Sequence, residues 1–181
     1  MPYSAEAIAN ELLRIAQGES AEVSPMKLQK LVYYSHGWGL AINDAPLIHE
    51  QIQAWKYGPV IPALYHEFKD FGNSPITRQA LELRVTGSQE METFAPDIES
   101  EPNGAEEDSF AHALVARIWE LYGQYSPTQL SRMTHEAGTP WHQVAAKFKF
   151  DPPPGINIPN ELIAQYFKAK MNPNNNAGGG A

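Results

Sequence analysis

Histidine, hydroxyl and carboxylate side chains are the groups of this 181-residue chain that could catalyse a reaction or bind a metal. None of the six histidines pairs at the HExxH spacing that places two imidazoles on one helix face. His135 and His142 could approach one another across a Gly-Thr-Pro turn, but hydrogen bonding at helix ends is their simpler role. Cysteine is absent, which excludes disulfides and thiolate zinc ligands. We therefore predict no metal and no cofactor.

Motifs that bind phosphate groups or activate a nucleophile are also missing. The sequence has no GxGxxG, no GxxxxGK[ST] and no GxSxG. Carboxylates are scattered, and nothing in the sequence pairs them for acid–base work. Because serine or threonine triads assemble from distant positions, a hydrolase with an unrecognised site stays open as an alternative.

Two lysines stand out on an otherwise apolar helix. Lys27 and Lys30 are three residues apart, so they project from neighbouring parts of the helix surface. They either form a solvated edge or offer a basic contact to a carboxylate of a partner. The sequence alone leaves both interpretations open.

A second group, of closely spaced polar and aromatic residues, lies nearer the C-terminal end of the chain. Thr134 and His135 fall at the end of one predicted helix, and Trp141 falls at the start of the next. The polar side chains could satisfy helix-end backbone groups while the indole fills the corner. The alternative is a surface pocket that receives a residue of a partner.

Helical periodicity and capping residues predict the elements that position these groups. We expect helices over residues 5–17, 25–42, 62–71, 109–125, 127–137 and 140–148, with a last helix opening after Pro159. Ser4 and Ser24 are the expected N-caps of the first two helices, and Pro25 suits a first helical position. Gly37 and Gly39 are expected where another backbone approaches closely.

The expected fold class is mainly α. We predict a single compact helical domain of about six to seven helices over residues 1–171. Short β elements are expected near residues 51–57 and 80–95, with a turn at residues 57–59. Residues 95–108 are expected to form an acidic linker within the domain, and residues 172–181 a disordered Asn/Gly tail.

The formal net charge of −8 is concentrated in one part of the chain, the acidic segment of residues 82–108. Its only base is Arg84, against nine acids, namely Glu82, Glu90, Glu92, Asp97, Glu99, Glu101, Glu106, Glu107 and Asp108. The segment is either a solvated linker or a surface that steers a basic partner. It repels phosphate backbones, which argues against nucleic acid as a partner.

No apolar stretch approaches the length that crosses a bilayer, and the N-terminus lacks the pattern of a signal peptide. We therefore expect no membrane partner and a cytoplasmic location.

Three motifs, taken in order and spacing, resemble the Panacea domain, also described as SocA-like or phage-associated. The first is PMKLQKLVYY at residues 25–34 with Gly37-Trp38, and the second is AWKYGPVIP at residues 54–62 with Leu64-Tyr65. The third comprises Thr134-His135-Glu136 and Pro140-Trp141. The resemblance spans roughly residues 4–170; the acidic segment and the tail are not part of the pattern.

The resemblance implies an antitoxin that neutralises a cognate toxin by direct binding, with the toxin encoded by an adjacent gene. It implies no catalytic activity. The alternatives are an adaptor that delivers its partner to an ATP-dependent protease and a phage-encoded transcriptional regulator; a homo- or hetero-oligomer stays open. Motif positions carried over as candidates for partner binding are Lys27, Lys30, Trp55, Tyr57, Gly58, Pro59, Thr134, His135 and Trp141, and Tyr65 is added as an exposed aromatic anchor.

Overall fold

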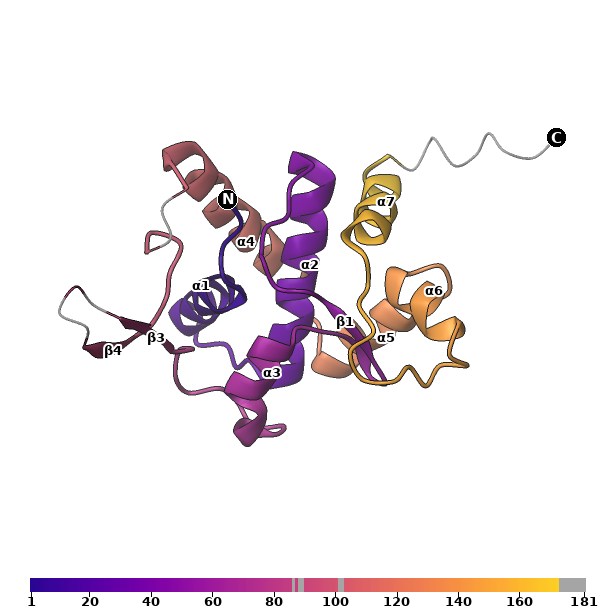
Figure 1. Cartoon of the computed structure of the whole chain (residues 1–181), viewed down its shortest axis with the longest axis horizontal. Helices are drawn as coiled ribbons and strands as arrows, with labels where there is room; N and C mark the ends of the chain where they lie inside the picture. The colour runs from indigo at the N-terminus through magenta and orange to yellow at the C-terminus, as the bar shows by residue number, and fades with distance from the viewer. Residues whose placement is uncertain (86, 88–89, 101–102, 173–181) are drawn as a thin grey trace.

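A computed structural model describes residues 1–85, 87, 90–100 and 103–172 (Figure 1). Within them the chain is mainly α-helical, with two small antiparallel sheets, which confirms the predicted fold class. The elements are α1 (Ala5–Gly18), α2 (Pro25–Asn43), β1 (Gln53–Trp55), β2 (Gly58–Val60), α3 (Pro62–Phe68), a 3₁₀ turn (Lys69–Phe71), β3 (Glu82–Val85), β4 (Met91–Phe94), α4 (Ala105–Tyr122), α5 (Pro127–His135), α6 (Pro140–Ala146) and α7 (Asn160–Met171). The predicted tail lies, from residue 173 onward, outside the described residues.

Capping side chains begin several of the helices. Ser4 accepts a hydrogen bond from the Ala7 amide at the start of α1, and Ser126 forms a capping box with Gln129 at the start of α5. Ser24 is the N-cap residue of α2, as predicted, although its side chain makes no capping hydrogen bond. Pro25 begins the helix at the first turn, where its missing N–H costs no hydrogen bond.

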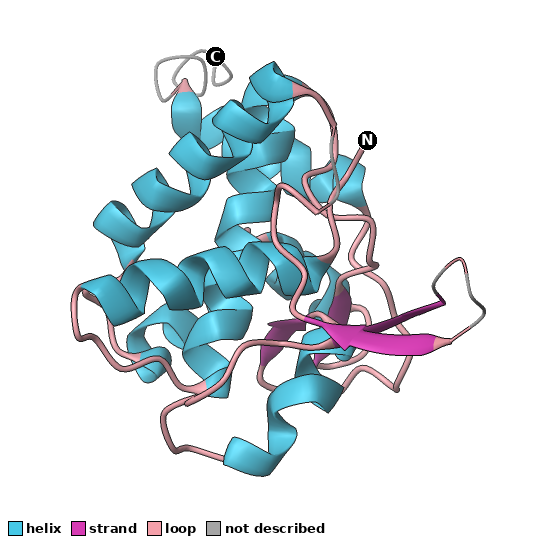
Figure 2. Cartoon of the chain, turned by 90° about the vertical axis from the view of Figure 1, so that its left-hand side faces the viewer, coloured by secondary structure: helices cyan, strands magenta, loops and turns pink. Residues whose placement is uncertain are grey.

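Helix α2 runs through the middle of the molecule (Figure 1) and packs against α1, α3, α4, α5, α7 and β2. Figure 2 shows how far helices predominate over the two small sheets. The central position of α2 explains why that helix is apolar nearly all round. The close approaches at its glycines are made by side chains rather than by another backbone, which corrects our expectation. A Cβ at Gly37 would lie 2.3 Å from the Phe167 ring, and one at Gly39 would lie 3.2 Å from Leu47 Cβ.

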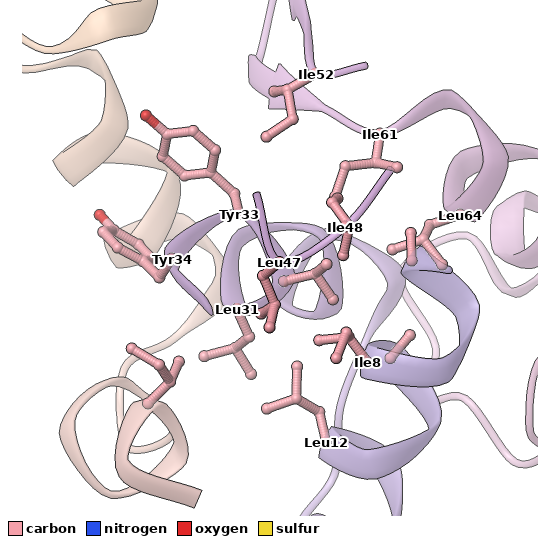
Figure 3. Close-up of a cluster of buried hydrophobic side chains, with 14 of the residues drawn as sticks. Ile8, Leu12, Leu31, Tyr33, Tyr34, Leu47, Ile48, Ile52, Ile61 and Leu64 are labelled. Carbon is pink, nitrogen blue, oxygen red and sulfur yellow. The ribbon is translucent and has the colours of Figure 1, made fainter. Parts of the chain in front are cut away.

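The core gathers side chains from both ends of the chain. Ile8 and Leu12 of α1 meet Leu31 of α2, and Ile48 and Leu64 close the cluster (Figure 3). The same buried cluster extends from Tyr3 to Phe167. None of the described helices combines the length and the apolar character needed to cross a membrane.

The β1–β2 hairpin is anchored on both sides. Trp55 pairs with Gly58, so the turn consists of Lys56 and Tyr57, and the predicted turn at residues 57–59 is displaced by one residue. On the other side of β1, the Ala54 amide donates to Ile156 O at 2.8 Å. These hydrogen bonds fix the hairpin between α2 and the segment that leads to α7.

The predicted acidic linker 95–108 is shorter than expected. Helix α4 begins at Ala105, so Glu106, Glu107 and Asp108 lie in its first turn. Carboxylates are favourable there because the N-terminal end of a helix carries partial positive charge. Three acidic residues that suggested a solvated linker therefore support a helix start.

Candidate functional site

The side chain of Lys30 is buried beneath the β1–β2 hairpin. Only 2% of its surface is exposed, and its Nζ donates to Tyr57 O at 3.1 Å and to Pro59 O at 3.0 Å. Burial lowers the pKa of Lys30 to about 7. Even the neutral amine has two N–H groups, enough for both carbonyls. Lys30 therefore links the first half of α2 to both sides of Gly58.

Gly58 is required by the close packing at this point. Its φ is +109°, a conformation that L side chains rarely adopt. A Cβ at Gly58 would lie 2.5 Å from Lys30 Nζ, 3.0 Å from Thr134 Oγ1 and 3.2 Å from His135 Cε1. One position thus brings residues of all three sequence motifs into contact.

The end of α5 closes the other side of this cluster. Thr134 Oγ1 donates to Ser131 O at 2.7 Å, and His135 Nδ1 donates to the same carbonyl at 2.6 Å. The His135 ring packs on Trp141 with centroids 3.9 Å apart, and Trp141 Nε1 donates to Trp55 O at 2.7 Å. These contacts match the structural interpretation of the third motif: helix-end carbonyls are satisfied and the indole fills the corner.

Lys27 lies apart from this cluster. Its Nζ donates to Gly123 O after α4 and lies 5.5 Å from the centroid of the Trp119 ring. Burial lowers the pKa of Lys27. Both interpretations of Lys27 and Lys30 assumed that the amines are exposed, whereas each amine is buried against backbone carbonyls.

Above the buried cluster, the hairpin turn presents an aromatic surface. Tyr57 is 68% exposed and Tyr65 is 42% exposed, as expected for candidate anchors. Trp55 packs edge-on against Tyr65 with ring centroids 4.8 Å apart. These residues border a groove of about 510 Å³ between the start of α2, the β1–β2 hairpin and α3; its other lining residues are Pro25, Met26, Gln29, Lys30, Lys56, Val60, Lys69, Gly72 and Asn73.

The groove is apolar with a positively charged rim. Lys56 and Lys69 are exposed at its edge, and no carboxylate is among its lining residues. No ion pair of Lys56 or Lys69 occurs within the part of the chain that the structure describes. This surface can receive an apolar side chain flanked by acidic groups.

Two residues of the site were not predicted from the sequence. Gln29 Oε1 accepts from the Ile61 amide at 2.9 Å, and its Nε2 donates to Ile61 O at 3.0 Å, so it holds the entry to α3. Ser131 Oγ donates to Tyr57 O at 3.3 Å, beside Lys30. Gln29 could have been noticed in the sequence, because it is an uncharged polar residue on the apolar face of a buried helix.

Over residues 1–85, 87, 90–100 and 103–172, no three histidines, aspartates or glutamates are placed to hold a metal ion together. In this site, buried polar groups fix a hairpin whose aromatic turn faces solvent.

The comparisons with known proteins agree on one family. The family model described as antitoxin SocA-like, Panacea domain, matches residues 28–142, which include every candidate residue except Lys27. The antitoxin SocA of Caulobacter vibrioides (strain NA1000 / CB15N) is 30% identical over 164 residues, covering 91% of this chain and 82% of that protein. No solved structure matches.

Proposed function

Because this chain belongs to the SocA-like antitoxin family with a Panacea domain, we propose that it is an antitoxin that neutralises a cognate toxin by direct protein–protein contact. The toxin is a separate protein, encoded by an adjacent gene. In this proposal the chain catalyses no reaction, and its chemistry is the recognition of that partner.

The observation that carries the proposal is the convergence of the three motifs on one hairpin. Lys30, Thr134 and Trp141 bind or pack against the backbone of the Trp55–Pro59 stretch. The same contacts hold Tyr57 at the surface, and Tyr65 of α3 packs beside the hairpin against Trp55. Large exposed aromatic side chains are typical anchors of protein interfaces. A fixed backbone under an exposed aromatic reduces the entropy lost on binding.

The chemistry of the groove beside this hairpin indicates which kind of partner segment it can bind. Its apolar floor and its two rim lysines suit an apolar anchor flanked by aspartate or glutamate. The toxin contact extends beyond the groove, because stable interfaces bury at least about 1,200 Å² in total. The groove is the proposed centre of that contact.

Co-expression with the neighbouring gene product tests the proposal. The wild-type chain is expected to restore growth and to co-purify with that protein. Tyr57→Ala and Tyr65→Ala, which remove exposed rings without disturbing the core, are each expected to weaken the complex by about 10-fold or more. Leu121→Ala is the matched control, because Leu121 is 40% exposed on α4 and should leave binding unchanged.

A pulse-chase experiment on the toxin separates this function from delivery to a protease. Neutralisation by contact leaves the half-life of the toxin unchanged in a pulse-chase experiment, whereas an adaptor shortens it. Failure of the wild-type chain to rescue growth or to co-purify with the toxin would overturn the proposal.

A further inference from the structure

A second, smaller pocket adjoins the groove at the end of β1. It has a volume of about 250 Å³ and is lined by Ala54, Trp55, Lys56, Pro152 and Pro154. Trp55 and Lys56 also line the groove between α2, the β1–β2 hairpin and α3. These two residues therefore form a common wall between the groove and the second pocket.

The far wall of the second pocket is held against β1 by main-chain hydrogen bonds. The Ala54 amide donates to Ile156 O at 2.8 Å, and the Ile158 amide donates to Ile52 O at 2.7 Å. The two lining prolines precede this anchored stretch, and the fixed φ of proline leaves their segment few alternative conformations. The pocket is thus formed before a partner binds, which lowers the entropy lost on binding.

The indole of the common wall is also fixed in place. Trp55 Nε1 donates to Gln53 Oε1 at 2.9 Å, and the ring packs edge-on against Tyr65. Two side chains on one face of a strand or helix, at positions i and i+2 or i and i+4, lie about 6–7 Å apart. A short segment of a partner can therefore place one apolar side chain on each side of this indole.

Lys56 supplies the charge at the common wall. Its side chain is exposed, its Nζ lies 5.9 Å from the centroid of the Tyr57 ring, and among the described residues it has no ion pair. None of the described carboxylates lines the groove or the second pocket, and Asp151, although next to Pro152 in the sequence, is not part of the lining. A carboxylate of the partner is the complementary group.

Charge also restricts which kind of molecule binds here. A second copy that docked through the same surface would bring its own Lys56 and Lys69 against these lysines, and their repulsion opposes that pairing. Two lysines on a chain with a net charge of −8 do not suit a phosphate backbone. A protein segment with apolar and acidic residues fits both the pockets and the charge.

We propose that the second pocket extends the docking surface of the groove, and that a single segment of the toxin crosses Trp55. One apolar side chain of that segment lies in the groove, another lies in the second pocket, and a carboxylate beside them pairs with Lys56. This inference rests on the antitoxin function proposed above. It adds Pro152 and Pro154, which lie outside the residues 28–142 that the family model matches, to the contact surface.

The first test compares two neighbouring prolines. Pro154→Ser removes part of the far wall, whereas Pro153→Ser is the matched control, because Pro153 is exposed and does not line the pocket. Isothermal titration with the purified toxin from the adjacent gene measures affinity. Pro154→Ser is expected to bind about 5-fold or more weakly than the wild type, and Pro153→Ser as tightly as the wild type. Equal affinities of all three proteins would overturn the proposal.

The second test identifies what occupies each pocket. The chain has no cysteine, so a single introduced cysteine can carry a photoactivatable benzophenone. Asn73→Cys labels the groove, Pro154→Cys labels the second pocket, and Lys170→Cys, exposed on α7, is the control. Crosslinks from the first two positions are expected in one segment of the toxin, within about ten residues of each other, and Lys170→Cys is expected to miss that segment.

The crosslinks also show which proposal fails, if one does. Crosslinks from Pro154→Cys that fall in a distant part of the toxin or in a second copy of this chain, or that are absent, would overturn the second pocket. If Tyr57→Ala still weakens the complex in that case, the antitoxin function and the groove stand without it. A wild-type chain that does not bind the toxin would instead overturn the antitoxin function itself, together with this inference.

Discussion

Lys30 Nζ donates a 3.0 Å hydrogen bond to the carbonyl oxygen of Pro59, although the two residues are 29 positions apart. The bond ties a buried amine of α2 to the strand that follows the exposed turn. Both residues are buried, and together they determine where Tyr57 is presented.

The first prediction concerns the dependence of stability on pH. The pKa of Lys30 is about 7 in the folded protein and has its ordinary value of 10.5 in the unfolded chain. Between these values the unfolded chain binds more protons, so the contribution of Lys30 to the unfolding free energy rises with pH, by up to about 1.4 kcal/mol per pH unit.

Lys30→Met removes this contribution. Urea unfolding of wild type and variant between about pH 7 and about pH 9.5 is expected to give a shallower rise for the variant. At the upper end of this range the variant is expected to be less stable by about 1–3 kcal/mol, because two buried carbonyls lose their donor. Parallel pH profiles for both proteins would contradict the assignment; Lys147→Met, at an exposed lysine, is the control.

The second prediction concerns Gly58. Gly58→Ala places a methyl group 2.5 Å from Lys30 Nζ on a backbone with φ of +109°. We expect a loss of about 2 kcal/mol or more in unfolding free energy, from strain and displacement of the amine. Gly18→Ala is the matched control, since a Cβ there meets nothing within 4 Å. Equal stability of the two variants would show that the packing at Gly58 is looser than described.

The third prediction concerns His112, which joins α4 to α1 and to residue 99. Its ring nitrogens lie 3.0 Å from Glu11 Oε1 and 2.9 Å from Glu99 Oε1. Burial opposes the charged form, but the hydrogen bonds to these carboxylates prevail and raise the pKa of His112. The stabilisation is therefore complete below about pH 6.5, the ordinary value, and is lost as the pH rises through the folded pKa.

Melting temperatures of wild type and His112→Gln test this link. The variant is expected to be less stable than the wild type at about pH 6, and the difference is expected to shrink by about pH 8. A difference that is the same at both pH values would show that the carboxylate contacts do not depend on the charge of the imidazole.

The fourth prediction concerns the rim of the groove. Lys56→Glu and Lys69→Glu invert its charge and are expected to slow association with the cognate toxin by about 10-fold at low salt, with a smaller effect at high salt. Stopped-flow association rates measure this. Lys170→Glu, on α7, changes the net charge equally and is expected to leave the rate nearly unchanged. A uniform effect of all three variants would indicate that net charge, and not the groove, governs association.

The sequence predicts much of the helical framework because caps, prolines and periodicity act locally. The helices expected to begin at residues 25, 127 and 140 do begin there. The acidic residues at 106–108 were assigned to a linker, since a run of carboxylates is compatible both with solvation and with a first helical turn. We propose that residues 1–171 fold as one domain, because a single buried cluster joins α1 to α7.

Less of the site than of the fold could be predicted from the sequence. The motif positions were identified, but the burial of Lys30 depends on carbonyls that are supplied by residues 57 and 59, and only the tertiary structure brings them together. Exposure of Tyr57 and Tyr65 follows from the two-residue turn and from the position of α3. The groove beside them is formed by residues of α2, the β1–β2 hairpin, α3 and the 3₁₀ turn, which no local pattern connects.

Amide hydrogen exchange of the chain, alone and bound to the toxin encoded by the adjacent gene, shows whether the toxin binds at the groove. We expect the toxin to slow exchange in the Lys56–Tyr57 turn and in α3, around Tyr65, while the buried face of α2 is already protected in the free chain. Unchanged exchange in the turn and in α3, with new protection confined to other parts of the surface, would contradict it.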